Sequence, residues 1–256
     1  DFDLASGKLC FPVSLTDSNK LFDVCLQLND DGPGYAFTVA SASKRTQSLP
    51  GIAEYTQQGG LIIPVVKFSN GAVFADVGFQ ASLDSSTSEV VFTVSGGEQI
   101  ALDSSQSIAR IWNEVLLDGI RNDFARPTVH SRNLFHASTL MYDLWAAFDD
   151  TSAPYLLSKT VTGFSCPFTG MPKPLDISQA RNEAISFAAY RLLSHRFANA
   201  PGVVKVSKEF DNTLAALGYD KNFSSQDYSA GSAAALGNYL AQCMIDYGLQ
   251  DGAKEQ

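Results

Sequence analysis

Long apolar runs, positive charge and histidine are all scarce in this chain of 256 residues. A membrane-spanning helix needs roughly 20 consecutive apolar residues, whereas the longest candidate here, AAALGNYLAQCMI, is interrupted by Asn238. Lysine and arginine number 18 and aspartate and glutamate 27, which gives a formal net charge of -9. Nucleic acids and anionic membranes attract basic surfaces, so neither is expected as a partner.

The chain also lacks the common catalytic and cofactor motifs. It contains no G-x-S-x-G nucleophile motif, no H-E-x-x-H zinc motif and no dinucleotide fingerprint. Its 3 histidines and 2 tryptophans all lie beyond residue 111, so the strand-rich residues 1–104 contain neither type. These patterns predict no metal site and no cofactor-binding residue.

The four cysteines, Cys10, Cys25, Cys166 and Cys243, show no C-x-x-C spacing of the kind that zinc sites use. Two fall in each half of the chain, so one interpretation is a disulfide within each half. Disulfides are typical of exported proteins, and this interpretation predicts a secreted or periplasmic location. The alternative is four buried free thiols in a cytoplasmic protein.

Residues 1–104 carry short aromatic or β-branched runs between Asp, Asn, Ser, Gly and Pro, a pattern typical of strands and turns. The runs in residues 8–41 recur in the same order in residues 60–95, with LCFPV matching LIIPV and YAFTVA matching VVFTV. Each copy predicts three strands with one apolar face. Two such faces can bury each other, so the predicted fold of this first domain is an antiparallel β-sandwich.

From Ser107 the apolar period changes to about 3.6 residues, which predicts a second, all-α domain, a helical bundle over residues 105–256. The whole chain is thus predicted as a two-domain α+β protein. Helix caps are expected at Asp176 and Ser232. One helix, beginning after Pro127, carries a predicted buried stripe made of Leu134, Ser138, Met141, Trp145 and Phe148.

The segment IWNEVLLDGIRNDFARPTVHSRNLFHASTLMYDLWAAFD, followed by EAISFAAYRLLSHRFANAPG, resembles the N-terminal helices of bacterial proteins related to vanadium-dependent haloperoxidases, in the acid-phosphatase-like superfamily. The resemblance covers about residues 105–256. It implies a vanadate or phosphate site built from Lys-Pro-x6-Arg-Pro, Pro-Ser-Gly-His and Ser-Arg-x5-His, whose Lys and Arg neutralise the oxyanion and whose His residues supply acid/base or ligand chemistry.

This chain departs from that pattern. Lys173 and Arg181 match most of the first motif, but Asn182 replaces its last proline, and we interpret the match as coincidence. Pro-Ser-Gly-His is absent, and Arg132 and His136 have the wrong spacing for the third motif. The implied vanadate site is therefore expected on a C-terminal segment or a second chain, and the sequence in hand is expected to be a fragment.

Arg132 and His136 are the candidate catalytic residues of the chain itself. They are four residues apart, so they share one face of the predicted helix and could face an anion together. The alternative is a histidine that packs between helices beside a surface arginine.

Two hypotheses about function follow. In the first, the chain is the N-terminal part of a haloperoxidase-like or phosphatase-like protein, inactive until the missing segment or partner completes the oxyanion site. In the second, it is a non-catalytic structural or assembly protein, with homo-oligomers as one expected form. Its repeat-built β module would then mediate assembly through exposed strand edges.

Overall fold

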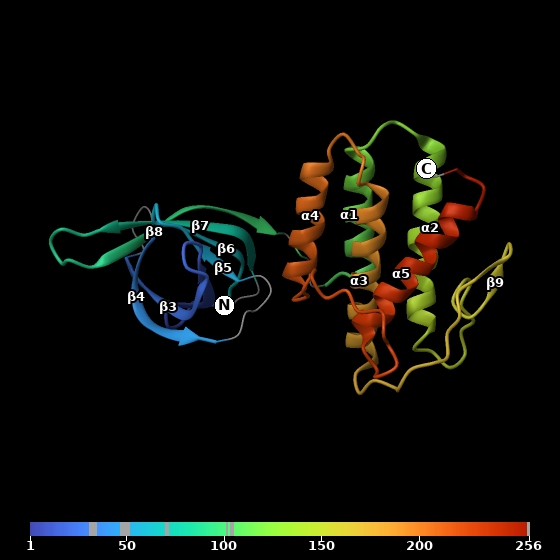
Figure 1. Cartoon of the computed structure of the whole chain (residues 1–256), viewed down its shortest axis with the longest axis horizontal. Helices are drawn as coiled ribbons and strands as arrows, with labels where there is room; N and C mark the ends of the chain where they lie inside the picture. The colour runs from blue at the N-terminus through green and yellow to red at the C-terminus, as the bar shows by residue number, and fades with distance from the viewer. Residues whose placement is uncertain (31–34, 47–51, 70–71, 101, 103–104, 255–256) are drawn as a thin grey trace. The chain divides into compact units, whose positions relative to one another are not determined.

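The structure, a computed structural model, describes residues 1–30, 35–46, 52–69, 72–100, 102 and 105–254. The chain divides into two compact units, Asp1–Leu102 and Asp103–Gln256, and each is described by itself (Figure 1). The domain boundary expected after residue 104 falls on a position outside the described residues.

The first unit is a β-barrel. Its strands are β1 (Phe2–Asp3), β2 (Lys8–Leu15), β3 (Lys20–Asp30), β4 (Ala36–Arg45), β5 (Ala53–Tyr55), β6 (Gly60–Lys67), β7 (Val73–Leu83) and β8 (Val90–Ile100). Around the barrel the order is β2-β3-β4-β8-β7-β6-β5, and β5 returns to β2. The β2–β5 pairing is parallel and the others are antiparallel, so the sheet is mixed. The short strand β1 pairs with the start of β2.

The predicted antiparallel β-sandwich is therefore wrong. The two sequence copies, each of which includes residues outside the described part, do correspond to two meanders, β2-β3-β4 and β6-β7-β8. They do not stack as two separate sheets, because β4 pairs with β8 and β5 joins β6 to β2. Period-two alternation gives every strand one apolar face, and a closed barrel buries such faces as well as a sandwich does.

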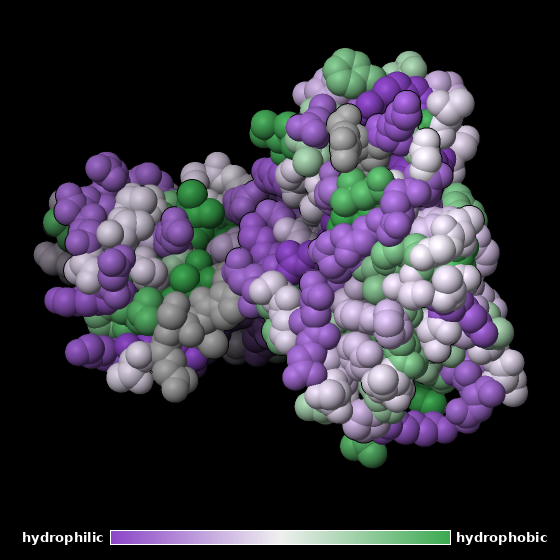
Figure 2. Space-filling model, turned by 45° about the vertical axis from the view of Figure 1, so that its right-hand side comes forward, coloured by the Kyte–Doolittle hydropathy of each residue, from purple (hydrophilic) through white to green (hydrophobic). Residues whose placement is uncertain are grey.

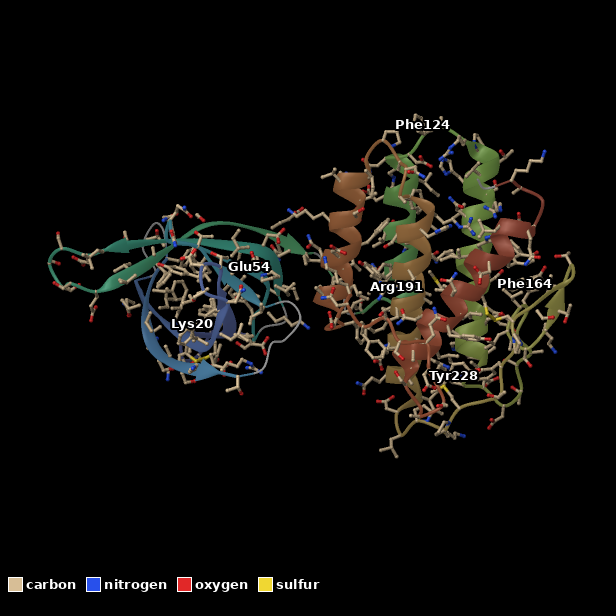
Figure 3. All side chains as sticks on the ribbon, in the orientation of Figure 1. Lys20, Glu54, Phe124, Phe164, Arg191 and Tyr228 are labelled. Carbon is tan, nitrogen blue, oxygen red and sulfur yellow. A yellow bond between two sulfur atoms is a disulfide. The ribbon has the colours of Figure 1, made fainter. Side chains whose placement is uncertain are left out.

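Many side chains of the strands point into the barrel interior (Figure 3). On β2 the buried residues are Leu9, Phe11 and Val13, and on β7 they include Val77 and Phe79. Successive residues of a strand point to opposite faces, so this alternation follows directly from the sequence pattern. Edge-to-face ring contacts, such as the one between Phe37 and Phe79, add to the packing.

The second unit contains five helices and one small hairpin. The helices are α1 (Ile108–Arg121), α2 (Pro127–Ala146), α3 (Ile177–Arg196), α4 (Val203–Ala216) and α5 (Ala233–Gln250), and the hairpin strands are β9 (Thr160–Val161) and β10 (Phe164–Ser165). The hairpin departs from the predicted all-α domain. The caps predicted at Asp176 and Ser232 are confirmed, because their side chains accept the backbone N–H groups of Gln179 and Ala235. None of these helices, within the described part of the chain, combines the length and apolar character of a membrane span.

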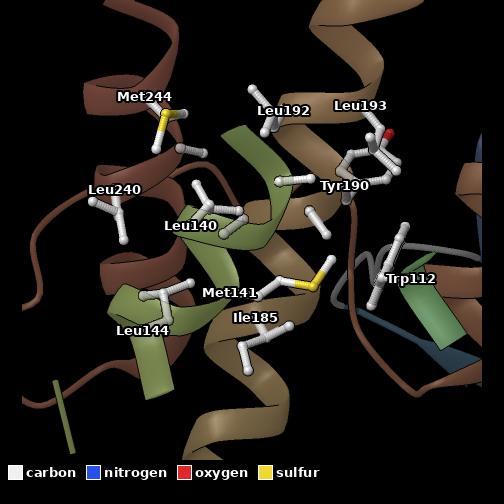
Figure 4. Packing of buried hydrophobic residues seen from close by; sticks show 14 of the residues in the cluster. Trp112, Leu140, Met141, Leu144, Ile185, Tyr190, Leu192, Leu193, Leu240 and Met244 are labelled. Atoms are coloured by element: carbon white, nitrogen blue, oxygen red, sulfur yellow. The ribbon is translucent and has the colours of Figure 1, made fainter. Parts of the chain in front are cut away.

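The five helices share one apolar core (Figure 4). Trp112 is fully buried in it and donates its indole N–H to the Ser186 hydroxyl, which removes the cost of burying that polar group. Gly237 lets α5 approach α3 closely, since a Cβ there would lie 2.3 Å from the Ala184 carbonyl oxygen. The disulfide Cys166–Cys243 ties the segment after the hairpin to α5.

The stripe predicted on α2 is wrong. Met141 is buried, but Leu134 is 37% exposed and Trp145 is 41% exposed. The face that packs inward carries His136 and Leu140 instead. Apolar residues lie on more than one side of α2, so periodicity alone does not select the buried side. Exposed hydrophobic side chains of this kind interrupt the hydrophilic surface of the molecule (Figure 2).

Candidate functional site

The barrel contains a cavity of about 210 Å³ that is open to solvent on one side. We call it the barrel cavity. Its walls come from β2, β3, β4, β5, β6 and β8, and the lining residues are Phe11, Val13, Leu15, Phe22, Val24, Leu26, Val39, Ala42, Tyr55, Leu61 and Phe92. All are aliphatic or aromatic.

The cavity lies beside the short pairing of β4 with β8. β4 pairs with β8 over only three residue pairs, from Ala36 to Thr38 on β4. Beyond this short closure β3 is the one described strand that pairs with β4, and Val39, which lines the cavity, is 48% exposed. Within the described residues no strand lies on the far side of this part of β4, and the inward-facing residues of the β2–β3 hairpin line the open cavity here.

The chemistry of the barrel cavity is that of a binding site for an apolar group. Tyr55 is the one lining residue with a polar side-chain atom, and its ring packs edge to face on Phe92. Apart from the Tyr55 hydroxyl, the described lining residues carry no acid, base or nucleophile. Apolar pockets take apolar ligands because both surfaces leave water.

A second polar cluster surrounds the sequence candidates Arg132 and His136 on α2. The Nε of Arg132 lies 2.6 Å from Oδ2 of Asp251, and its Nη2 donates to the Gly248 carbonyl oxygen at 2.7 Å. Nη2 of Arg196 lies 2.9 Å from Nδ1 of the His136 imidazole. The helix thus brings the two candidates together, and tertiary packing adds Arg196 from α3 and Asp251 from the end of α5.

Burial and neighbouring charge set the ionisation of this cluster. Burial, followed by the positive charges of Arg196 and Arg132, lowers the pKa of His136 to about 4. Burial and the charge of Arg132 lower the pKa of Arg196 to about 10. Burial alone would raise the pKa of the Asp251 carboxyl, but hydrogen bonds from Arg132 and the Ala253 N–H hold it below its usual value. At neutral pH the cluster therefore contains two guanidinium cations, one carboxylate and a neutral imidazole.

These contacts connect the C-terminal end of α5 to α2, and α2 to α3. The carbonyl groups at a helix C-terminus carry partial negative charge, and Arg132 meets them at Gly248. Arg132 and His136 are both engaged inside the protein, and their catalytic role stays a prediction.

The other motif residues lie apart from this cluster. Lys173 lies 3.7 Å from the exposed Asp150 carboxylate. Arg181 stacks over the Trp145 ring, with its guanidinium carbon 4.2 Å from the centroid, and donates to the Phe148 carbonyl oxygen. The Arg181 contacts lie at the C-terminal end of α2, whereas Lys173 and Asp150 both lie in the segment between α2 and α3. The interpretation that the Lys173–Arg181 match is coincidental stays a prediction.

Sequence reasoning missed the barrel cavity and two members of the cluster. Alternation identifies Phe11 and Val24 as inward-facing, but it does not show that the barrel leaves space between them. Arg196 and Asp251 lie 60 and 119 residues from their partners on α2, and no local pattern marks them.

The described residues contain no group of three or more His, Cys, Asp or Glu side chains that could hold a metal ion. No protein-family model, curated protein or solved structure matches the chain. The haloperoxidase resemblance and its vanadium site therefore gain no support from relatives, and the β-sandwich plus helical bundle that went with them is corrected by the barrel. The oxyanion site on another segment stays a prediction.

Proposed function

We propose that this chain is a binding protein whose β-barrel takes up an apolar group in the barrel cavity. The observation that carries the proposal is an open cavity of about 210 Å³ lined by apolar side chains from six strands. Close packing is the rule in protein interiors, and unfilled apolar space of this size costs stability. A ligand that fills the space recovers those contacts.

The volume sets the size of the group. An engineered apolar cavity of about 150 Å³ stays dry and binds benzene. The barrel cavity is larger, so it fits one aromatic ring system or a branched aliphatic group. At about 0.5 kcal/mol per heavy atom, near the lower end of the range for small ligands, a ligand the size of indole is expected to bind with a dissociation constant of about 0.1 to 1 mM.

Titration with toluene and with indole, followed by two-dimensional NMR, tests this proposal. The amide signals of Phe11, Val24 and Val39 and the methyl signals of the two valines should shift together and saturate. Filling the cavity by Val24→Phe should abolish the shifts. Val91→Phe is the matched control, because Val91 lies on β8 and does not line the cavity. Shifts scattered over the protein, or binding that survives Val24→Phe, would refute the barrel site.

A further inference from the structure

The free edge of β4 runs past the mouth of the barrel cavity. From Val39 to Lys44 every residue of β4 is exposed, and the register pairs this half of the strand with β3 only. Within the described residues no other strand bonds to it. A row of unpaired backbone N–H and C=O groups is a template for another extended chain.

The register shows which backbone groups are free. Cys10 directs its N–H away from β3, and its Cα lies 4.0 Å from that of Cys25, the spacing of a non-hydrogen-bonded pair. Cys25 therefore turns its own N–H and C=O toward β4, where it pairs with Ser41. Because these groups alternate in direction along a strand, those of Ala42 and Lys44 project from the free edge.

The edge and the cavity form one surface. Val39 and Ala42 lie on the edge and also line the cavity. The residues between and after them, Ala40, Ser41 and Ser43, are small, so another backbone can approach without a steric barrier. A strand added here would place alternate side chains over the open side of the barrel, where the cavity receives an apolar one.

We infer that the natural occupant of the barrel is an extended peptide segment that adds to the edge of β4 and inserts one apolar side chain into the cavity. This inference rests on the proposed function. Backbone groups of Ala42 and Lys44 supply the pairing, and the cavity supplies side-chain selectivity. The exposed Lys44 favours an acidic residue in the segment next to the inserted side chain.

The test uses two pools of eight-residue peptides and the full chain. In the first pool apolar residues alternate with threonine and one end carries aspartate; in the second the same peptides are N-methylated at alternate amides. The first pool should bind and should protect the Ala42 and Lys44 amides from hydrogen exchange, whereas in the free protein these amides are expected to exchange rapidly. The second pool should not bind.

Two variants at one position separate edge pairing from cavity filling. Lys44→Pro removes the outward N–H, which a strand edge tolerates, while Lys44→Gln keeps it. Lys44→Pro should weaken peptide binding about tenfold or more, as expected for a lost hydrogen bond and a disturbed edge, whereas Lys44→Gln should change it by less than about threefold. Indole binding should be unchanged in both variants, and their NMR spectra should report intact barrels.

Each remaining outcome has a defined meaning. Peptide binding that is indifferent to Lys44→Pro and leaves the Ala42 and Lys44 amides unprotected overturns the strand-addition inference but not the cavity site. Indole binding with no binding of either pool does the same. If the wild-type protein binds neither indole nor the peptides, the proposed function itself is overturned. Concentration-dependent dimers that Lys44→Pro abolishes would make a second copy the occupant and would also overturn the peptide inference.

Discussion

Arg196 donates an N–H to Nδ1 of His136 across 2.9 Å, and this contact fixes the state of the imidazole. A guanidinium has no acceptor atom, so Nδ1 must be unprotonated. The ring proton then sits on Nε2, which lies 3.5 Å from Oδ2 of Asp251. The buried histidine is thus held neutral between an arginine and a carboxylate.

The neutral state of His136 makes stability depend on pH. Its pKa is about 4 in the folded protein and about 6.5 in the unfolded chain. Below pH 6.5 His136 becomes protonated in the unfolded chain but stays neutral in the folded protein. The contribution of His136 to the free energy of unfolding is therefore fully present above pH 6.5 and is lost as the pH falls toward 4. After allowance for solvent screening the loss should be about 2 kcal/mol.

Urea unfolding of the wild type and of His136→Gln at several pH values measures this effect. The glutamine amide keeps an acceptor for Arg196 but does not titrate. The difference in free energy of unfolding between the two proteins should change across pH 6.5 to 4 and stay constant above it. A constant difference over the whole range would contradict the assigned ionisation.

The second prediction concerns Asp143, which is fully buried in α2. Its carboxylate accepts the backbone N–H groups of Tyr155, Leu156 and Leu157 at 2.6 to 2.8 Å. Asp143→Ala would leave three N–H groups without acceptors, so the free energy of unfolding should fall by about 3 to 5 kcal/mol. Asp150→Asn, at an exposed position, is the control and should change it by less than about 0.5 kcal/mol. Chemical denaturation measures both.

The third prediction concerns the contact between α3 and α5. Because a Cβ at Gly237 would lie 2.3 Å from the Ala184 carbonyl oxygen, Gly237→Ala must separate the two helices. The expected loss of stability is about 3 kcal/mol, even though alanine favours helix more than glycine does. Gln242→Ala on the exposed side of α5 should be nearly neutral. Thermal unfolding that ranks the two variants the other way would show that the close approach is not essential.

The fourth prediction separates the two disulfides. Cys10 is exposed in the Cys10–Cys25 pair, whereas Cys166 and Cys243 are both buried. A mild reductant should therefore open the first bond before the second, as alkylation followed by peptide mass spectrometry would show.

Replacing both cysteines of a pair by alanine should lower the free energy of unfolding. The expected loss is about 3 kcal/mol for Cys10–Cys25, which are 15 residues apart, and about 4 kcal/mol for Cys166–Cys243, which are 77 residues apart. Equal rates of reduction would contradict the burial difference. Secretion or periplasmic location stays a prediction.

In the first unit, the sequence pattern predicted strands and inward-facing residues but not how the strands pair. The alternation in runs such as LCFPV identified the inward-facing Leu9 and Phe11, and the repeat identified two three-strand copies. Both the sandwich and the barrel satisfy these local constraints. The choice depends on which strands pair across the two copies, namely β4 with β8 and β2 with β5, and these pairings join residues far apart in the chain.

The cluster around Arg132 and His136 was also predicted from the sequence only in part. The four-residue spacing placed Arg132 and His136 on one helix face, as the helical repeat requires. Their partners Arg196 and Asp251 come from other helices, and only packing of α3 and α5 against α2 brings them within hydrogen-bonding distance. That packing makes His136 a buried neutral acceptor, whereas its sequence position left open both a histidine that faces an anion and a histidine that packs between helices.

The sequence by itself determined the six longer strands, the helices and the caps at Asp176 and Ser232, because these depend on residues a few positions apart. It also led to the hypothesis that exposed strand edges of the β module mediate assembly. Only the tertiary structure decided that the strands close into a barrel, that the closure between β4 and β8 is short, and that an apolar cavity opens beside Val39. Closure and unfilled volume are properties of the whole set of side chains packed together, and no local pattern encodes them.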